Sequence, residues 1–114
     1  MKNRNSTRYY SNKQEKNVAK TLKGKKTVNS GAARFSAGDV NTDLFLLECK
    51  TKTTDSRTMT LQKEWIIKNE EEAFATGKLY SAVVIDFGDG VNHYIISEKL
   101  FKYLNQKLME EENL

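Results

Sequence analysis

A chain of 114 residues is long enough for one domain with one modest core. It contains one cysteine, Cys49, and one histidine, His93, which excludes an internal disulfide and a Cys/His zinc site and disfavours a Cys-His or Ser-His hydrolase. No apolar run approaches the roughly 20 residues of a membrane span, and no apolar stretch follows the basic start as it does in a secretion signal. We therefore expect an intracellular, cytoplasmic protein without a membrane partner.

The positive charge of the chain is concentrated in its first 30 residues. They hold nine lysines and arginines against one acid, Glu15, so this segment has a net charge of +8 while the whole chain has +4. A basic end of this kind is typical of proteins that bind polyanions. A solubilising segment would have the same composition, so composition leaves both interpretations open.

The first half of the chain predicts one helix and three strands. Residues 1–10 are expected to form a flexible basic arm. A capping box at Ser11–Gln14 predicts a helix from Ser11 to about Leu22, ended by Gly24. A short strand is predicted over 25–30 and a loop of small residues over 31–38. Residues 39–42 then lead into the strongest strand of the sequence, over 44–50.

The second half predicts a helix, two strands and a last helix. A polar loop over 51–60 precedes a helix from Leu61 to about Ala75, ended by Gly77, with Leu61 and Trp65 expected in the core. A buried strand over 80–87 and a strand over 91–96 are joined by a glycine-rich hairpin turn.

Ser97 is predicted to cap the last helix, on which four apolar residues share one face: Leu100, Phe101, Leu104 and Leu108. The element order is α-β-β-β-α-β-β-α. This order predicts a single α/β domain over residues 11–114, in which a mixed sheet is flanked by helices.

The strand over 44–50 carries the candidate chemistry. Side chains alternate along a strand, so Glu48 and Lys50 face one side and Cys49 faces the other. A buried carboxylate is costly unless it is paired or binds a metal. Asp39 lies nine residues before Glu48, and the two meet if their segments are neighbouring strands.

These residues suit phosphodiester hydrolysis. Proteins hold Mg²⁺ with one or two carboxylates together with water and phosphate oxygens, and Asp39 and Glu48 would supply the carboxylates. Lys50 would orient the attacking water and offset the developing charge, and the backbone carbonyl of Cys49 is a candidate further ligand. The alternative is that Glu48 and Lys50 form a surface cross-strand pair and that Asp39 is a turn residue.

The segments 38–40 and 45–51, which contain Asp39, Glu48 and Lys50, resemble the motif of the PD-(D/E)XK nuclease superfamily. Within it, residues 11–97 are most similar to archaeal-type Holliday junction resolvases and related small phage endonucleases. Gly38 stands where the motif has proline. The resemblance implies a restriction-endonuclease-like core, built from a helix, a meander of three strands, a second helix and a further strand.

The same resemblance implies roles for further residues. Glu15 matches an acid that faces the metal from the first helix, Ser30 matches a serine near the phosphate, and Gln62 or Lys63 would be the polar residue of the next helix. The catalytic set would be Glu15, Ser30, Asp39, Glu48 and Lys50. Basic residues are candidates for contacts to backbone phosphates: Arg8, Lys13, Lys16, Lys20, Lys25, Lys26, Arg34, Lys52 and Arg57.

The expected function is therefore a Mg²⁺-dependent endonuclease, with Mn²⁺ able to substitute. It would act as a homodimer on four-way junctions or other branched DNA in recombination, and a phage source would suit so compact an enzyme. Three alternatives stay open. They are a nuclease or nickase acting on ordinary duplex DNA, a non-catalytic nucleic-acid-binding module of the same fold, and an unrelated small α/β interaction protein with a basic arm.

Overall fold

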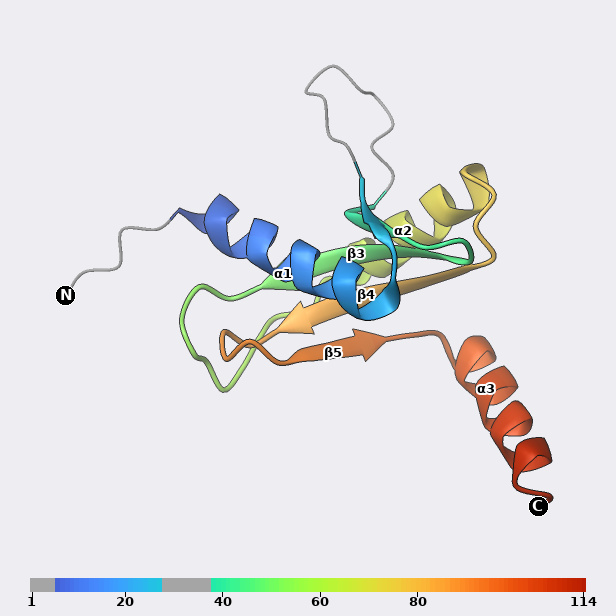
Figure 1. Ribbon diagram of the computed structural model, residues 1–114. Coiled ribbons are helices and arrows are strands. Elements are labelled where there is room, and N and C mark those ends of the chain that lie inside the picture. The colour runs from blue at the N-terminus through green and yellow to red at the C-terminus, as the bar shows by residue number, and fades with distance from the viewer. Residues whose placement is uncertain (1–5, 28–37) are drawn as a thin grey trace.

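The computed structural model describes residues 6–27 and 38–114, which form a five-stranded mixed sheet and three helices (Figure 1). The predicted α/β class and the predicted order of elements are confirmed. The strands lie side by side in chain order: β1 (Lys25–Lys26), β2 (Val40–Asn41), β3 (Phe45–Thr51), β4 (Tyr80–Asp86) and β5 (Asn92–Ile95). In the described part of the chain, no helix combines the length and apolar character that crossing a membrane requires.

The connections explain the mixed character of the sheet. A tight turn joins β2 to β3, so these strands are antiparallel, with Val40 opposite Leu47. Strands β3 and β4 are parallel, which requires a crossover, and α2 (Lys63–Ala75) provides it. The β4–β5 pair is an antiparallel hairpin in which the Asp86 carboxylate accepts hydrogen bonds from Gly88 and Gly90.

Helix α1 (Thr7–Leu22) begins earlier than predicted. Its N-cap is Ser6, whose hydroxyl accepts a hydrogen bond of 3.3 Å from the backbone N–H of Tyr9. The predicted start at Ser11 was therefore wrong, and residues 7–10, expected in the flexible arm, are helical. The predicted end is confirmed, because Lys23 takes the left-handed conformation directly before Gly24.

Helices α1 and α2 cover opposite faces of the sheet (Figure 1). On the α1 face, Val18 packs against a cluster that contains Val40, Leu47, Cys49 and Val84. On the α2 face, the buried side chain of Asn69 donates hydrogen bonds of 3.1 and 3.0 Å to the carbonyl oxygens of Leu46 and Ala82. Because β3 is covered on both sides, its residues are held firmly, including Glu48 and Lys50 near its end.

Helix α2 begins at Lys63, two residues later than predicted. Leu61 therefore lies before the helix and is 48% exposed, and Trp65 is only partly buried. The expectation that these two residues form part of the core was wrong. The predicted end of α2 is confirmed, since Gly77 follows it with a φ of +76°.

Helix α3 (Glu98–Glu111) differs most from the prediction. Its cap is confirmed, since the Ser97 hydroxyl accepts a hydrogen bond of 3.1 Å from the N–H of Leu100. The helix then runs away from the sheet instead of packing on it (Figure 1). Leu100 is its only buried residue, and Phe101, Leu104 and Leu108 are exposed. The expected flanking of the sheet thus holds for α1 and α2 only.

Candidate active site

A cavity of about 680 Å³ opens between α1, the β1–β2 edge of the sheet and α2. Three of the predicted carboxylates line it, although they are far apart in the sequence: Glu15 on α1, Asp39 before β2 and Glu48 on β3. The rest of the lining is polar or charged: Thr7, Arg8, Ser11, Asn12, Lys26, Thr27, Gly38, Lys68 and Glu72. The fold therefore brings the predicted acids to one place.

Asp39 and Glu48 are cross-strand neighbours. The register pairs Val40 with Leu47 and ends there, so Asp39 and Glu48 are the residues next to this last pair on the two strands. The backbone N–H of Asp39 donates a hydrogen bond of 2.8 Å to the carbonyl of Leu47, the residue opposite Val40, so Asp39 and Val40 both lie against Leu47. As expected, β2 and β3 are neighbouring strands, and Asp39 and Glu48 line the same cavity.

Beyond the end of β2, the Asp39 side chain supplies a hydrogen-bond acceptor for the backbone of β3. Its Oδ2 accepts a hydrogen bond of 2.7 Å from the backbone N–H of Cys49. The N–H and C=O of one strand residue point to the same side, so the Cys49 carbonyl is directed toward this same edge. The Cys49 thiol lies in the core instead, where burial raises its pKa. Cys49 does not line the cavity, and its carbonyl, not its sulfur, is the group that points toward this edge of the sheet.

Lys50 is held between a carboxylate and an aromatic ring. Its Nζ lies 3.3 Å from Oε2 of Glu48 and 4.8 Å from the centroid of the Trp65 ring. Both contacts are made on the α2 face of the sheet, because Glu48 and Lys50 alternate with Cys49 along β3. An ammonium over an indole face gains a cation–π attraction, so Trp65 fixes Lys50 beside Glu48.

Glu15 is positioned by its neighbour in the sequence. Gln14 is buried, and its amide donates to the carbonyl of Lys50 at 3.0 Å and to Asn92 at 3.3 Å, which anchors α1 over the end of β3. Glu15 then faces the cavity and forms an ion pair of 3.6 Å with Lys26. Lys26, predicted to contact DNA, is therefore paired with Glu15 in this structure.

The acids of the cavity disfavour one another's ionised forms. Burial, and then the negative charge of Asp39, raise the pKa of both Glu15 and Glu48. Lys26 opposes the increase at Glu15, and Lys50 and Lys68 oppose it at Glu48. Asp39 is thus the common electrostatic neighbour of the two glutamates, and a further cation in the cavity would stabilise all three charges.

Gly38 has a conformation that a proline cannot adopt. Its φ is +64°, whereas the proline ring fixes φ near −65°. A Cβ atom here would also lie 2.7 Å from Cγ of Leu46. The departure from the nuclease motif at this position is therefore a difference in backbone shape, and it leaves the N–H of Gly38 to donate to Glu72 at 3.3 Å.

Lys68 and Glu72 of α2 also line this cavity, and neither was expected there from the sequence. Gln62 and Lys63 were proposed in this role, but they are exposed at the start of α2 and do not line the cavity. Lys68 and Glu72 follow Trp65 at i+3 and i+7, so they share its side of α2, and this spacing is visible in the sequence.

The remaining phosphate-contact candidates surround the cavity only in part. Arg8 lines it. Lys13, Lys16 and Lys20 lie on the exposed side of α1, opposite the buried Gln14 and Val18. Three others are exposed in β1 and in the loop after β3: Lys25, Lys52 and Arg57. Ser30 and Arg34 lie outside the described residues.

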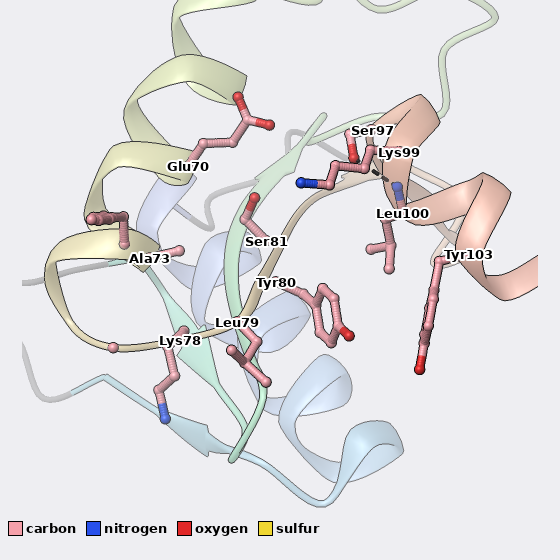
Figure 2. A pocket seen from close by; sticks show the side chains of 12 residues that line it. Glu70, Ala73, Lys78, Leu79, Tyr80, Ser81, Ser97, Lys99, Leu100 and Tyr103 are labelled. Carbon is pink, nitrogen blue, oxygen red and sulfur yellow. Dashed lines mark hydrogen bonds between the residues drawn. The ribbon is translucent and has the colours of Figure 1, made fainter.

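A second cavity, of about 590 Å³, lies between the end of α2, the start of β4 and the start of α3 (Figure 2). Its lining includes Leu79, Tyr80, Leu100 and Tyr103, and it contains none of the sequence-predicted site residues. Lys78 at its edge is occupied with a hydrogen bond of 2.6 Å to the carbonyl of Thr42. The carboxylate cavity is therefore the candidate active site.

The donor set of the carboxylate cavity suits a hard divalent cation. Within residues 6–27 and 38–114, no three Asp, Glu, His or Cys side chains are close enough together to hold a metal as they stand. The ammonium groups of Lys26 and Lys50 currently pair with Glu15 and Glu48. Rotation of these flexible side chains would free carboxylate oxygens beside Asp39, and such oxygens are the ligands that Mg²⁺ prefers.

Comparisons with known proteins give no relative for this chain. It matches no protein-family model, and searches of curated proteins and of solved structures find no match.

Proposed function

We propose that this chain is a Mg²⁺-dependent endonuclease of the PD-(D/E)XK type that cuts branched DNA. The observation that carries the proposal is the meeting of Glu15, Asp39 and Glu48 in one cavity, with Lys50 paired to Glu48. The order α-β-β-β-α-β and the parallel β3–β4 pair around α2 also agree with the restriction-endonuclease-like core that the sequence resemblance implies.

Each residue has a role that its position allows. Asp39 and Glu48, with the Cys49 carbonyl directed to the same edge, would hold the cation, and Glu15 would complete its surroundings from α1. A bound Mg²⁺ would polarise the scissile phosphate and lower the pKa of water. Lys50, released from Glu48, would orient that water with its ammonium group, and Trp65 would limit the positions that Lys50 can take.

The surroundings of the cavity favour a polyanionic substrate. Arg8 lines it, and Lys13, Lys16 and Lys20 form an exposed basic row on α1. Such residues contact phosphates without reading sequence, so recognition would depend on DNA shape. Resolution of a four-way junction needs two symmetric cuts, so the proposal includes two copies related by a two-fold axis.

The test is cleavage of a labelled four-way DNA junction and a matched linear duplex, each with Mg²⁺ or with EDTA. We expect paired nicks in the junction only with metal, lost in Glu48→Gln and Lys50→Met. Glu64→Gln is the matched control, because Glu64 is an exposed acid of α2 that does not line the cavity.

Two other results would change the assignment. Equal cutting of the duplex would keep the nuclease and refute the preference for branched DNA. Junction binding without cutting, in Mg²⁺ and in Mn²⁺, would refute catalysis and leave a non-catalytic nucleic-acid-binding module of this fold.

A further inference from the structure

Lys26 places a positive charge in the carboxylate cavity, beside Glu15. Its Nζ lies 3.6 Å from Oε1 of Glu15 and donates a hydrogen bond of 3.3 Å to Oδ1 of Asn12. Asn12 and Glu15 are three residues apart on α1 and therefore share one face of that helix, and both line the cavity together with Lys26. Two side chains of α1 thus hold the ammonium group of Lys26 inside the cavity.

The backbone of Lys26 is fixed by the sheet. Lys26 pairs with Val40 across the β1–β2 register, and the N–H of the next residue, Thr27, donates a hydrogen bond of 2.9 Å to the carbonyl of Asp39. Lys26 therefore belongs to the strand that lies against the segment carrying Asp39. Rotation of its side chain can release an oxygen of Glu15, but it keeps the positive charge at the rim of the cavity.

The charges of the cavity match one divalent cation better than two. Among the described residues, the lining carries four carboxylates against three cations, a net charge of −1: Glu15, Asp39, Glu48 and Glu72 against Arg8, Lys26 and Lys68. The ammonium of Lys50, paired with Glu48, adds a further positive charge. One Mg²⁺ bound by Asp39 and Glu48 therefore already outweighs the negative charge of the lining.

A second metal ion would have to bind close to Lys26. Sites with two metal ions hold them about 3.5–4 Å apart, so an ion at Glu15 would lie near both the first ion and the ammonium group. Repulsion between charges at such distances is strong in a partly enclosed site. Glu15 already has a cation, because Lys26 is its ion-pair partner and opposes the increase in its pKa.

We infer that Lys26 serves as the fixed cation of this cavity, in the place of a second metal ion, and limits the site to one divalent cation per chain. The inference rests on the proposed metal-dependent function and specifies it. Glu15, paired with Lys26, would complete the surroundings of the ion at Asp39 and Glu48 and would not bind an ion of its own.

The test is the number of Mn²⁺ ions bound per chain, measured without nucleic acid by electron paramagnetic resonance of the free ion during a titration. We expect one bound ion for the unsubstituted chain. Lys26→Met removes the fixed cation and should lower the Kd of a second Mn²⁺ by about tenfold or more, so that two ions bind. Lys26→Arg keeps the charge and should bind one ion.

Lys25→Met is the matched control, because Lys25 precedes Lys26 in β1, is exposed and does not line the cavity. It removes the same charge from the chain and should still bind one ion, and circular dichroism would establish that all the variants are folded. Two ions in the unsubstituted chain, or one ion in Lys26→Met, would refute the role of Lys26 and leave the metal-dependent function standing. A chain that binds no Mn²⁺ would refute both.

Discussion

The carboxylate of Asp39 accepts a hydrogen bond of 2.7 Å from the backbone N–H of Cys49 while it lines the same cavity as Glu48. One carboxylate oxygen of Asp39 thus holds the backbone of β3, and the negative charge of Asp39 raises the pKa of Glu48. A residue that both completes the sheet and contributes charge to the cavity has two functions that substitution can separate.

Asp39→Asn and Asp39→Ala separate these functions. The asparagine keeps an acceptor for the Cys49 N–H and removes the charge, whereas alanine leaves that N–H without an acceptor. We expect Asp39→Ala to have a free energy of unfolding about 1–3 kcal/mol below that of Asp39→Asn, the cost of a buried donor that has lost its partner. Urea unfolding of both variants measures the difference. Equal stabilities would mean that water replaces the carboxylate at no cost.

The two variants should behave alike toward metal. Without the Asp39 charge, Mg²⁺ loses a ligand and a nearby anion, so neither variant should gain the increase in melting temperature that the unsubstituted chain gains through mass action. Thermal unfolding with and without Mg²⁺ checks this. A full Mg²⁺ response in Asp39→Asn would place the metal elsewhere.

Glu48 should make the metal-free chain less stable as the pH rises. Burial, followed by the charge of Asp39, raises the pKa of Glu48 above its usual 4.5, so the folded chain binds a proton here more tightly than the unfolded chain. The contribution to stability is then fully present below pH 4.5 and is lost as the pH rises through the raised pKa.

Glu48→Gln should therefore flatten the pH dependence above 4.5 and should not lower the melting temperature at neutral pH. Melting temperatures measured across this range without metal test the sign. A Glu48→Gln variant that melts well below the unsubstituted chain at pH 7 would show that the pair with Lys50 outweighs burial.

Trp65 is the only tryptophan of the chain, and the ammonium of Lys50 lies 4.8 Å from its ring centroid. A divalent cation that binds Glu48 competes with Lys50 for this carboxylate and changes the position of the ammonium over the ring. We expect Mg²⁺ to change the emission of Trp65 saturably, and the change to be absent in Glu48→Gln and in Lys50→Met. An equal change in both variants would mean that the signal has another origin.

Asn69 is fully enclosed, and its amide donates to two neighbouring strands, at the carbonyls of Leu46 and Ala82. Asn69→Leu keeps a similar side-chain volume and removes both donors. It should lower the free energy of unfolding by about 1 kcal/mol for each lost hydrogen bond. Asn69→Asp places an acceptor against two carbonyl oxygens and should cost about 3–5 kcal/mol at neutral pH, as uncompensated buried charges do. Denaturant unfolding compares the two variants, and equal losses of stability would show that water reaches the site of Asn69.

The order of elements follows from local sequence patterns. Ser97 and Gly77 act through groups a few residues away, so the start of α3 and the end of α2 could be predicted from the sequence. The meeting of Asp39 and Glu48 was predictable for the same reason, because a short turn between antiparallel strands leaves few registers. The start of α1 was missed because Ser6 and Ser11 are both competent caps, and local chemistry does not choose between them.

Only the tertiary structure decided which distant residues share the cavity and where α3 lies. Glu15 reaches Asp39 because the buried Gln14 anchors α1 to β3 and β5, which no local pattern specifies. Lys68 joins the cavity because α2 packs on the face of β3 that carries Glu48. The apolar stripe of α3 was visible in the sequence, but its periodicity says only that the face favours contact with another apolar surface. The crossover through α2 places that helix on the sheet, whereas the chain after β5 leaves it, and this arrangement leaves the stripe exposed.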